Sequence, residues 1–203
     1  MHGGGYPLSM QRIAIAGGIG SGKTAVTDYL ASKGVVIVDA DVVARDVVAP
    51  GETAYLQLVD AFGRGILADD STLDRALVAD VVFRDATALR RLNRITHFAI
   101  GIEIVRRCDE NANAVVAIAL PLYRPEHRSL FGVTQAWLVR AREDVVLTRL
   151  TTSRMMDLGD AQRRIVAQQA LALPDDAFDA IIDNSEDLHA TYANVDRLLA
   201  ELA

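Results

Sequence analysis

The stretch that most constrains the fold of this chain is IAIAGGIGSGKTAV at residues 13–26. Residues 12–16 are short, mostly apolar and followed at once by glycines, which predicts a buried strand that runs into a turn. Residues 23–32 then carry a helical pattern that stops near Gly34. Residues 35–39 form an apolar run that ends in a carboxylate, as expected for a parallel strand buried on both faces. Strand, helix and strand together predict a β-α-β unit.

The rest of the chain continues this alternation after one long helical interruption. From about residue 41 to 108 the helical period dominates, with turn residues at 49–52 and 68–72, so we expect several helices and no strand there. Further strands are predicted at residues 114–119, 135–139 and 180–183, and further helices at residues 142–152, 160–169 and 188–202. The pattern indicates an α/β fold with a mostly parallel sheet and a helical insertion.

Length, charge and cysteine content exclude several classes of protein. A chain of 203 residues suits one domain with a buried core, and its apolar runs are too short to span a membrane, so we expect a soluble protein. The net charge of −6 offers no broad basic surface, which argues against nucleic acid and anionic lipid as partners. Cys108 is the only cysteine, which excludes an internal disulfide and favours a reducing, cytoplasmic location.

Four residues of the opening stretch fit the phosphate-binding pattern G-x-x-x-x-G-K-[ST]: Gly17, Gly22, Lys23 and Thr24. Glycines allow successive backbone N–H groups to approach a polyphosphate, and the following helix directs its positive end toward it. Lys23, one of only two lysines, would reach the β and γ phosphates, and Thr24 would hold Mg²⁺. The alternative is a glycine-rich turn that binds nothing. We infer a bound nucleoside triphosphate.

Two carboxylates follow the second predicted strand. Asp39 ends that strand and Asp41 comes two residues later, at the edge where open parallel sheets bind ligands. A carboxylate there can accept a proton from a hydroxyl that attacks the γ-phosphoryl group. Alternatively, Asp41 caps a helix over residues 42–48.

Taken together, these motifs resemble the dephospho-CoA kinase family. The matching pieces, in family order, are GGIGSGK, VDADVVARDVVAPG, FGRGIL, LDRALVADVVF, LNRITH, PLY and IIDN. The resemblance implies a P-loop kinase with a five-stranded parallel core, a helical acceptor-binding insertion and a lid that carries arginines. It implies ATP and Mg²⁺ as cofactors and dephospho-CoA as the second substrate. We expect a single kinase domain: a flexible extension at residues 1–11, a core at 12–48 and 112–203, the insertion at about 49–111 and the lid at about 149–172.

The resemblance also assigns roles to individual residues. Asp41 matches the catalytic base, while Arg149 and Arg154 match lid arginines that close on ATP. Arg45, Arg75 and His97 match positions on the acceptor side, although a solvated arginine or an ordinary helix-face histidine would give the same pattern. The implied catalytic set is Asp41, Lys23 and Arg154, and the implied metal ligands are Thr24 and Asp39. The implied nucleotide-binding set is Gly17, Gly18, Gly20, Ser21, Gly22, Lys23, Thr24, Ala25, Arg149 and Asn184, the last beside an adenine edge or in a turn.

The chain departs from the family pattern near the end of the third strand. The family usually has a carboxylate where this chain has Ala119, and PLYRPEH at residues 121–127 differs from the usual loop. Asp39 could replace the missing acid. The alternatives to a dephospho-CoA kinase are therefore a nucleotide-binding protein without phosphoryl transfer, or a kinase for another nucleotide or nucleoside hydroxyl. We expect a monomer or a weak homo-oligomer.

Overall fold

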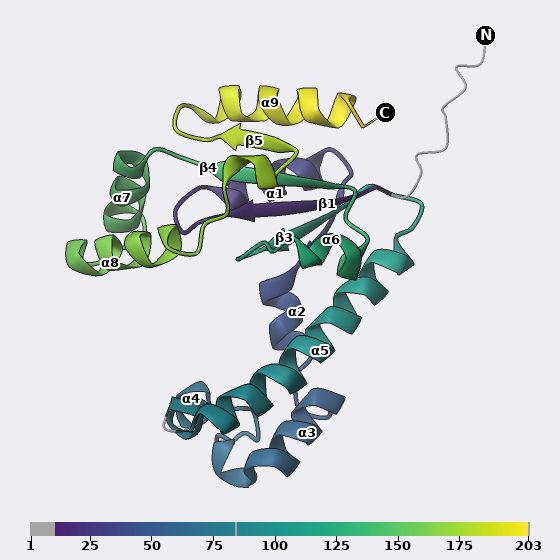
Figure 1. The fold of residues 1–203 in the computed structure, drawn as a ribbon, viewed down its shortest axis with the longest axis vertical. Helices are drawn as coiled ribbons and strands as arrows, with labels where there is room; N and C mark the ends of the chain where they lie inside the picture. The colour runs from purple at the N-terminus through teal and green to yellow at the C-terminus, as the bar shows by residue number, and fades with distance from the viewer. Residues whose placement is uncertain (1–10, 84, 203) are drawn as a thin grey trace. The chain divides into compact units, whose positions relative to one another are not determined.

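The computed structural model describes residues 11–83 and 85–202, so the predicted extension lies almost wholly outside the described residues. Five parallel strands form one sheet in the described part of the chain, in the order β2-β3-β1-β4-β5 (Figure 1). The strands are β1 (Arg12–Gly17), β2 (Val36–Asp39), β3 (Val116–Leu120), β4 (Gln135–Arg140) and β5 (Ala180–Asp183). The predicted α/β fold with a five-stranded parallel sheet is confirmed.

The chain divides into two compact units, residues 1–39 with 108–203 and residues 40–107. The first unit contains the sheet. Its helices are α1 (Lys23–Ser32), α6 (Glu126–Phe131), α7 (Glu143–Thr152), α8 (Leu158–Gln169) and α9 (Leu188–Ala200), with a 3-10 turn η2 (Asp175–Ala177). Its core lies where α1 and α9 cover the sheet and includes Ile13, Leu30, Trp137, Ile182 and Val195.

The central strands are apolar because both of their faces are covered. In β3 all five residues are buried, and in β1 the residues from Arg12 to Ala16 are buried. The exception is the charged Arg12, whose guanidinium is paired with Asp109 and donates to the main-chain oxygen of Phe131. Strands of this kind need β-branched or small apolar residues on both sides, and the sequence supplies them.

The second unit, Ala40–Arg107, is helical. It contains α2 (Ala40–Asp46), α3 (Thr53–Phe62), η1 (Arg64–Ile66), α4 (Arg75–Phe83) and most of α5 (Ala86–Glu110). Its buried residues include Val43, Tyr55, Leu58 and Ile104. Arg107 of α5 pairs with Asp46 of α2 at 2.7 Å, which ties the two ends of the unit together. The unit begins nine residues before the expected insertion, because α2 continues directly from β2.

The helix after β3 was missed by the sequence analysis, which treated residues 124–127 as loop. It is only six residues long, and its N-cap residue is Pro125. A single turn and a half carries too few residues for a helical period to be recognised.

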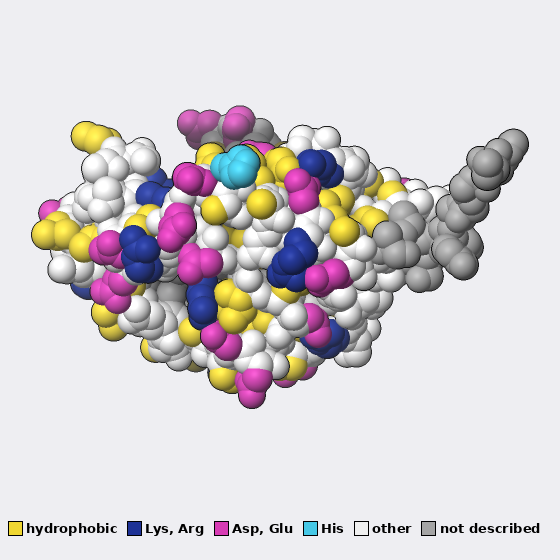
Figure 2. All heavy atoms as spheres, turned by 90° about the horizontal axis from the view of Figure 1, so that it is seen from above, with side chains coloured by type: hydrophobic (Ala, Val, Ile, Leu, Met, Phe, Trp, Pro, Cys, Tyr) yellow, Lys and Arg dark blue, Asp and Glu magenta, His cyan; other side chains and the backbone are white. Residues whose placement is uncertain are grey.

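The net negative charge of the chain predicts no broad basic surface. Basic and acidic side chains are interspersed on the face drawn in Figure 2, without a continuous basic patch on that face.

None of the helices in the described part of the chain is long and apolar enough to cross a membrane.

Candidate active site

The phosphate-binding loop, residues 17–24, connects the carboxyl end of β1 to the first turn of α1. Gly20 and Gly22 have φ values of 72° and 89°, in the left-handed region that glycine adopts without strain. Gly22 is the N-cap of α1, and Lys23 is the first helical residue. The unpaired N–H groups and positive end of a helix lie at this terminus, so the loop has the local structure of an anion site.

The side chains of Asn184 and Arg149 donate hydrogen bonds to main-chain oxygens of the loop. The Asn184 amide Nδ2 donates to the Ser21 carbonyl oxygen at 2.8 Å. The Arg149 guanidinium donates to the main-chain oxygens of Gly20 at 3.3 Å and Ser21 at 3.4 Å. The structure therefore brings two predicted nucleotide-binding residues to the loop, where they contact its backbone. Their predicted contacts with ATP remain predictions.

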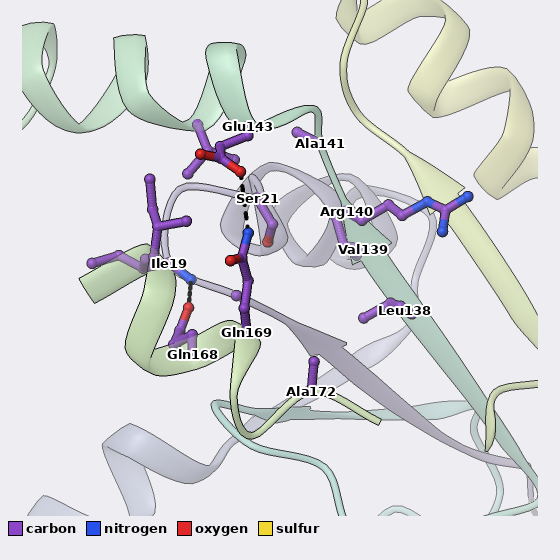
Figure 3. Close-up of a pocket in the computed structure, with 13 residues that line it drawn as sticks. Ile19, Ser21, Leu138, Val139, Arg140, Ala141, Glu143, Gln168, Gln169 and Ala172 are labelled. Carbon is purple, nitrogen blue, oxygen red and sulfur yellow. Dashed lines mark hydrogen bonds between the residues drawn. The ribbon is translucent and has the colours of Figure 1, made fainter. Parts of the chain in front are cut away.

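The predicted lid, at about residues 149–172, covers the end of α7 and all of α8, two helices that pack through Val146, Leu150, Ala161 and Ile165. Two glutamines at the end of α8 make polar contacts, as Figure 3 shows. The Gln168 amide oxygen accepts a hydrogen bond from the Ile19 N–H of the phosphate-binding loop. The Gln169 amide donates to the Glu143 carboxylate of α7 at 3.2 Å. These contacts were missed by the sequence analysis, because nothing in residues 168–169 indicates a partner so far away in the chain.

Two cavities border the loop within the sheet unit. One of about 270 Å³ is lined by Gly18, Ile19 and Ser21 of the loop, by the end of β4 and by α7 and α8 (Figure 3). The other, of about 280 Å³, is lined by Gly17, Gly18, residues 121–123 and the segment after α8. Space for a ligand of small-molecule size therefore exists on both sides of Gln168, which lines both cavities.

Asp39 and Ala119 are neighbours across the β2–β3 pair, where they are register partners. Side chains of register partners in a parallel sheet point to the same side, about 4.8 Å apart. Asp39 is thus placed beside the position at which the family resemblance leads us to expect a second carboxylate. Among residues 11–83 and 85–202, no group of three or more His, Cys, Asp or Glu side chains is arranged to hold a metal ion. A hydroxyl and a single carboxylate nevertheless suit Mg²⁺, which keeps several waters and binds substrate phosphates.

Comparison with known proteins assigns this chain to a family. The family model for dephospho-CoA kinase matches residues 11–190. A dephospho-CoA kinase of Shouchella clausii is 37% identical over 195 residues, which cover 95% of this chain and 98% of the relative. One of Corynebacterium efficiens is 38% identical over 198 residues, covering 95% and 98%. The chain belongs to the dephospho-CoA kinase family.

Solved structures agree on the fold. A crystal structure from Thermus thermophilus has a TM-score of 0.74 at 23% identity and covers 95% of this chain and 98% of its own. A dephospho-CoA kinase from Campylobacter jejuni has a TM-score of 0.62 at 17% identity, covering 96% and 98%. The resemblance to the dephospho-CoA kinase family that the motifs predict is confirmed by the family model and by the curated relatives.

The predicted catalytic base and the predicted acceptor-side residues belong to the helical unit. Asp41 is exposed and is the second residue of α2, and the Arg45 guanidinium donates to the Asp41 main-chain oxygen at 3.0 Å. Arg75 begins α4 and His97 lies within α5, and both are exposed. Because α2 begins at Ala40, Asp41 is not the N-cap of a helix over residues 42–48, and that alternative is wrong. Its role as the base of a dephospho-CoA kinase remains a prediction.

Two further residues bear on the predicted lid and on the loop at residues 121–127. Arg154 is exposed in the connection between α7 and α8, next to Met155, whose φ is 50°. In the loop that departs from the dephospho-CoA kinase pattern, the His127 ring accepts a hydrogen bond from the Arg124 N–H at 3.2 Å. Burial lowers the pKa of His127. Its ring packs against Tyr123 and Phe131, so the unusual loop residues are held by local packing.

Proposed function

We propose that this protein transfers the γ-phosphoryl group of ATP to the ribose 3′-hydroxyl of dephospho-CoA and so produces coenzyme A. The observation that supports this most directly is the phosphate-binding loop at residues 17–24, within a chain that belongs to the dephospho-CoA kinase family over residues 11–190. The loop supplies an anion site at the start of α1, and family membership selects the reaction and the acceptor.

In the proposed reaction the loop amides and Lys23 bind the β and γ phosphates, so fixed donors meet the negative charge of the transferring group. Thr24 and Asp39 would hold Mg²⁺, which neutralises charge on the phosphate oxygens when it is bound. Asp41 accepts the proton of the 3′-hydroxyl. The hydroxyl oxygen bonds to the γ-phosphorus as the bond from that phosphorus to the departing ADP oxygen breaks.

The other predicted residues complete the proposed site. Arg154, on the connection between α7 and α8, would neutralise charge on the transferring group, as mobile arginines do in phosphoryl transfer. Arg45, Arg75 and His97 would bind the acceptor. The remaining nucleotide contacts are assigned to Gly17, Gly18, Gly20, Ser21, Gly22, Ala25, Arg149 and Asn184. A cytoplasmic monomer or weak homo-oligomer, acting without nucleic acid or membrane, belongs to the same proposal.

The proposal is tested by ADP release with ATP, Mg²⁺ and dephospho-CoA, beside adenosine and other nucleosides as acceptors. Asp41→Asn is expected to keep ATP binding and to lower kcat about 10²-fold or more, because the hydroxyl then loses its proton acceptor. Asp60→Asn removes an exposed carboxylate of α3 in the same helical unit and is the matched control. If Asp41→Asn retains turnover within a few-fold of the unchanged protein, Asp41 is not the base.

One observation favours a second candidate function. Ala119 stands where the family usually has a carboxylate, so a nucleotide-binding protein without phosphoryl transfer is the alternative. The same assay separates the two functions. ADP release with dephospho-CoA supports the kinase, whereas ATP binding without turnover for any acceptor supports the alternative, and turnover with a different hydroxyl would reassign the substrate.

A further inference from the structure

The carbonyl oxygen of Ser21, in the phosphate-binding loop, is held by hydrogen bonds from two side chains. It accepts a hydrogen bond from Asn184 Nδ2 at 2.8 Å and another from Arg149 at 3.4 Å. A trans peptide is planar, so its carbonyl and its N–H point in opposite directions. Fixing the Ser21 oxygen therefore also fixes the direction of the Gly22 N–H, which belongs to the same peptide plane. That N–H lies at the N-terminus of α1, where anions bind.

The Asn184 side chain is itself held in one orientation. Asn184 and Thr191 are each only 1% exposed. The Ser21 carbonyl oxygen can only accept, so the amide atom that faces it is the donor Nδ2, and the other amide atom, Oδ1, accepts from the Thr191 hydroxyl at 3.0 Å. The Asn184 main chain is also tied, because its N–H donates to the Arg140 oxygen at 2.7 Å and its oxygen accepts from Arg149 at 2.9 Å. Both polar atoms of this buried amide are therefore hydrogen-bonded in the observed orientation.

Glycine at position 22 matches this arrangement sterically. A Cβ atom added to Gly22 would lie 1.8 Å from Asn184 Nδ2, well inside any allowed contact. The Asn184 amide thus occupies the space that a side chain at residue 22 would need. The left-handed φ of Gly22 is a second, independent reason for glycine at this position. The close approach of the Asn184 amide to the loop backbone is therefore possible only because residue 22 has no side chain.

We propose that Asn184, oriented by Thr191 and assisted by Arg149, is a positioning residue for phosphate binding: it holds the Ser21–Gly22 peptide so that the Gly22 N–H faces the bound phosphate. This inference rests on the proposed function, because it takes the loop as the site of the ATP phosphates. It gives Asn184 a role different from the adenine contact that the motif predicts. It also gives Arg149 a role in shaping the loop before ATP binds.

Inorganic triphosphate is the probe that separates a phosphate-positioning role from an adenine contact, since it has no base. Calorimetric titration of the unchanged protein and Asn184→Asp with ADP and with inorganic triphosphate is the central experiment. The variant keeps the shape of the side chain but cannot donate to Ser21, so we expect about tenfold weaker binding of both ligands. Loss of ADP binding with unchanged triphosphate binding would overturn the proposal, as would no triphosphate binding by the unchanged protein.

Further variants keep the test informative if Asn184→Asp is unstable. Thr191→Val removes the hydroxyl that orients the amide while preserving volume, and we expect a smaller loss of triphosphate affinity in the same direction. Asn194→Ala is the matched control, because Asn194 also lies in α9 but its amide donates to the Ile181 oxygen of β5. It should leave triphosphate affinity unchanged. Equal losses for Thr191→Val and Asn194→Ala would indicate a general structural effect and overturn the proposal.

A spectroscopic signature distinguishes positioning from simple stability. In the unchanged protein the amide resonance of Gly22 should shift on addition of triphosphate, and in Thr191→Val the resonance should broaden or shift before any ligand is added. An unperturbed Gly22 resonance in that variant would contradict the proposal. Catalysis is a separate outcome: if triphosphate binding depends on Asn184 but dephospho-CoA is not phosphorylated, the proposed function fails and the positioning role stands.

Discussion

Asp39 and Ala119 pose the main question about individual residues in this kinase. They are register partners on β2 and β3, and Ala119 is 2% exposed. A carboxylate at residue 119, which the family resemblance leads us to expect, would therefore be buried directly beside Asp39. In this chain a single carboxylate remains on these two neighbouring positions, which makes Asp39 the acid expected to support Mg²⁺.

Restoring the second acid tests that assignment. Ala119→Asp is expected to destabilise the protein by about 1–3 kcal/mol without Mg²⁺, because it buries a carboxylate next to another one. Mg²⁺ with ADP should recover part of this loss, since the ion offsets the repulsion. Thermal unfolding with and without Mg²⁺ and ADP measures both effects. Ala119→Asn is the uncharged control, and an equal response of the two variants to Mg²⁺ would argue against a metal site beside Asp39.

Helix α8, in the predicted lid, illustrates how an element can contact the phosphate-binding loop without any sequence signal. The Gln168 amide oxygen accepts a hydrogen bond from the Ile19 N–H, although the two residues are 149 positions apart in the chain. A ligand phosphate that uses the same N–H must displace this side chain. The end of α8 therefore competes with an anion for one donor of the loop.

Gln168→Ala should tighten ADP binding about two- to fivefold, because a net hydrogen bond of roughly 1 kcal/mol no longer competes with the ligand. The same variant should speed amide hydrogen exchange in α8, which loses an anchor. Gln169→Ala, which breaks the contact with Glu143 of α7, is the control: it should speed exchange but leave ADP affinity unchanged. Weaker ADP binding by Gln168→Ala would mean that this side chain supports the nucleotide.

Elements with strong local signals could be predicted from the sequence. The helix at residues 23–32 and the strand at 180–183 have the bounds that the sequence predicts, because glycines or polar residues flank their apolar patterns. The helix α6 could not, since Glu126–Phe131 is too short to show a period. For the site, the glycine spacing indicates the loop. The contacts of Asn184 and Arg149 with its backbone depend on packing between distant segments, which no local pattern encodes.

At the scale of the whole molecule, the helical unit is the connection between two adjacent parallel strands. The chain leaves β2 at Asp39 and returns to β3 at Val116. Parallel neighbours always require a crossover, and a crossover can be enlarged without disturbing the sheet, because only its two ends are fixed. This arrangement lets one sheet unit retain its phosphate-binding loop while the inserted unit carries a separate core and its own charge network.

The charge network of the helical unit gives it a distinctive dependence on pH. Arg106 and Arg107 donate hydrogen bonds to the Glu103 carboxylate, and Arg107 also pairs with Asp46 of α2. These contacts, that of Arg106 above all, lower the pKa of Glu103 from 4.5 to about 2. A carboxylate whose pKa is lower in the folded state stabilises the fold above its unfolded pKa. This contribution is therefore complete above about pH 4.5 and is lost as the pH falls toward about 2.

Glu103→Gln should accordingly lower the free energy of unfolding at pH 7 by about 1 kcal/mol, a modest value because the network is partly exposed to solvent. The difference from the unchanged protein should shrink as the pH is lowered from 4.5 toward 2, since the unchanged protein then loses the same ionised group. Urea unfolding across this range measures it. Asp69→Asn, which removes an exposed carboxylate from a turn of the same unit, is the control for the loss of a charge at pH 7. A Glu103→Gln difference that stays constant from pH 7 to pH 2 would show that packing, rather than charge, accounts for the loss.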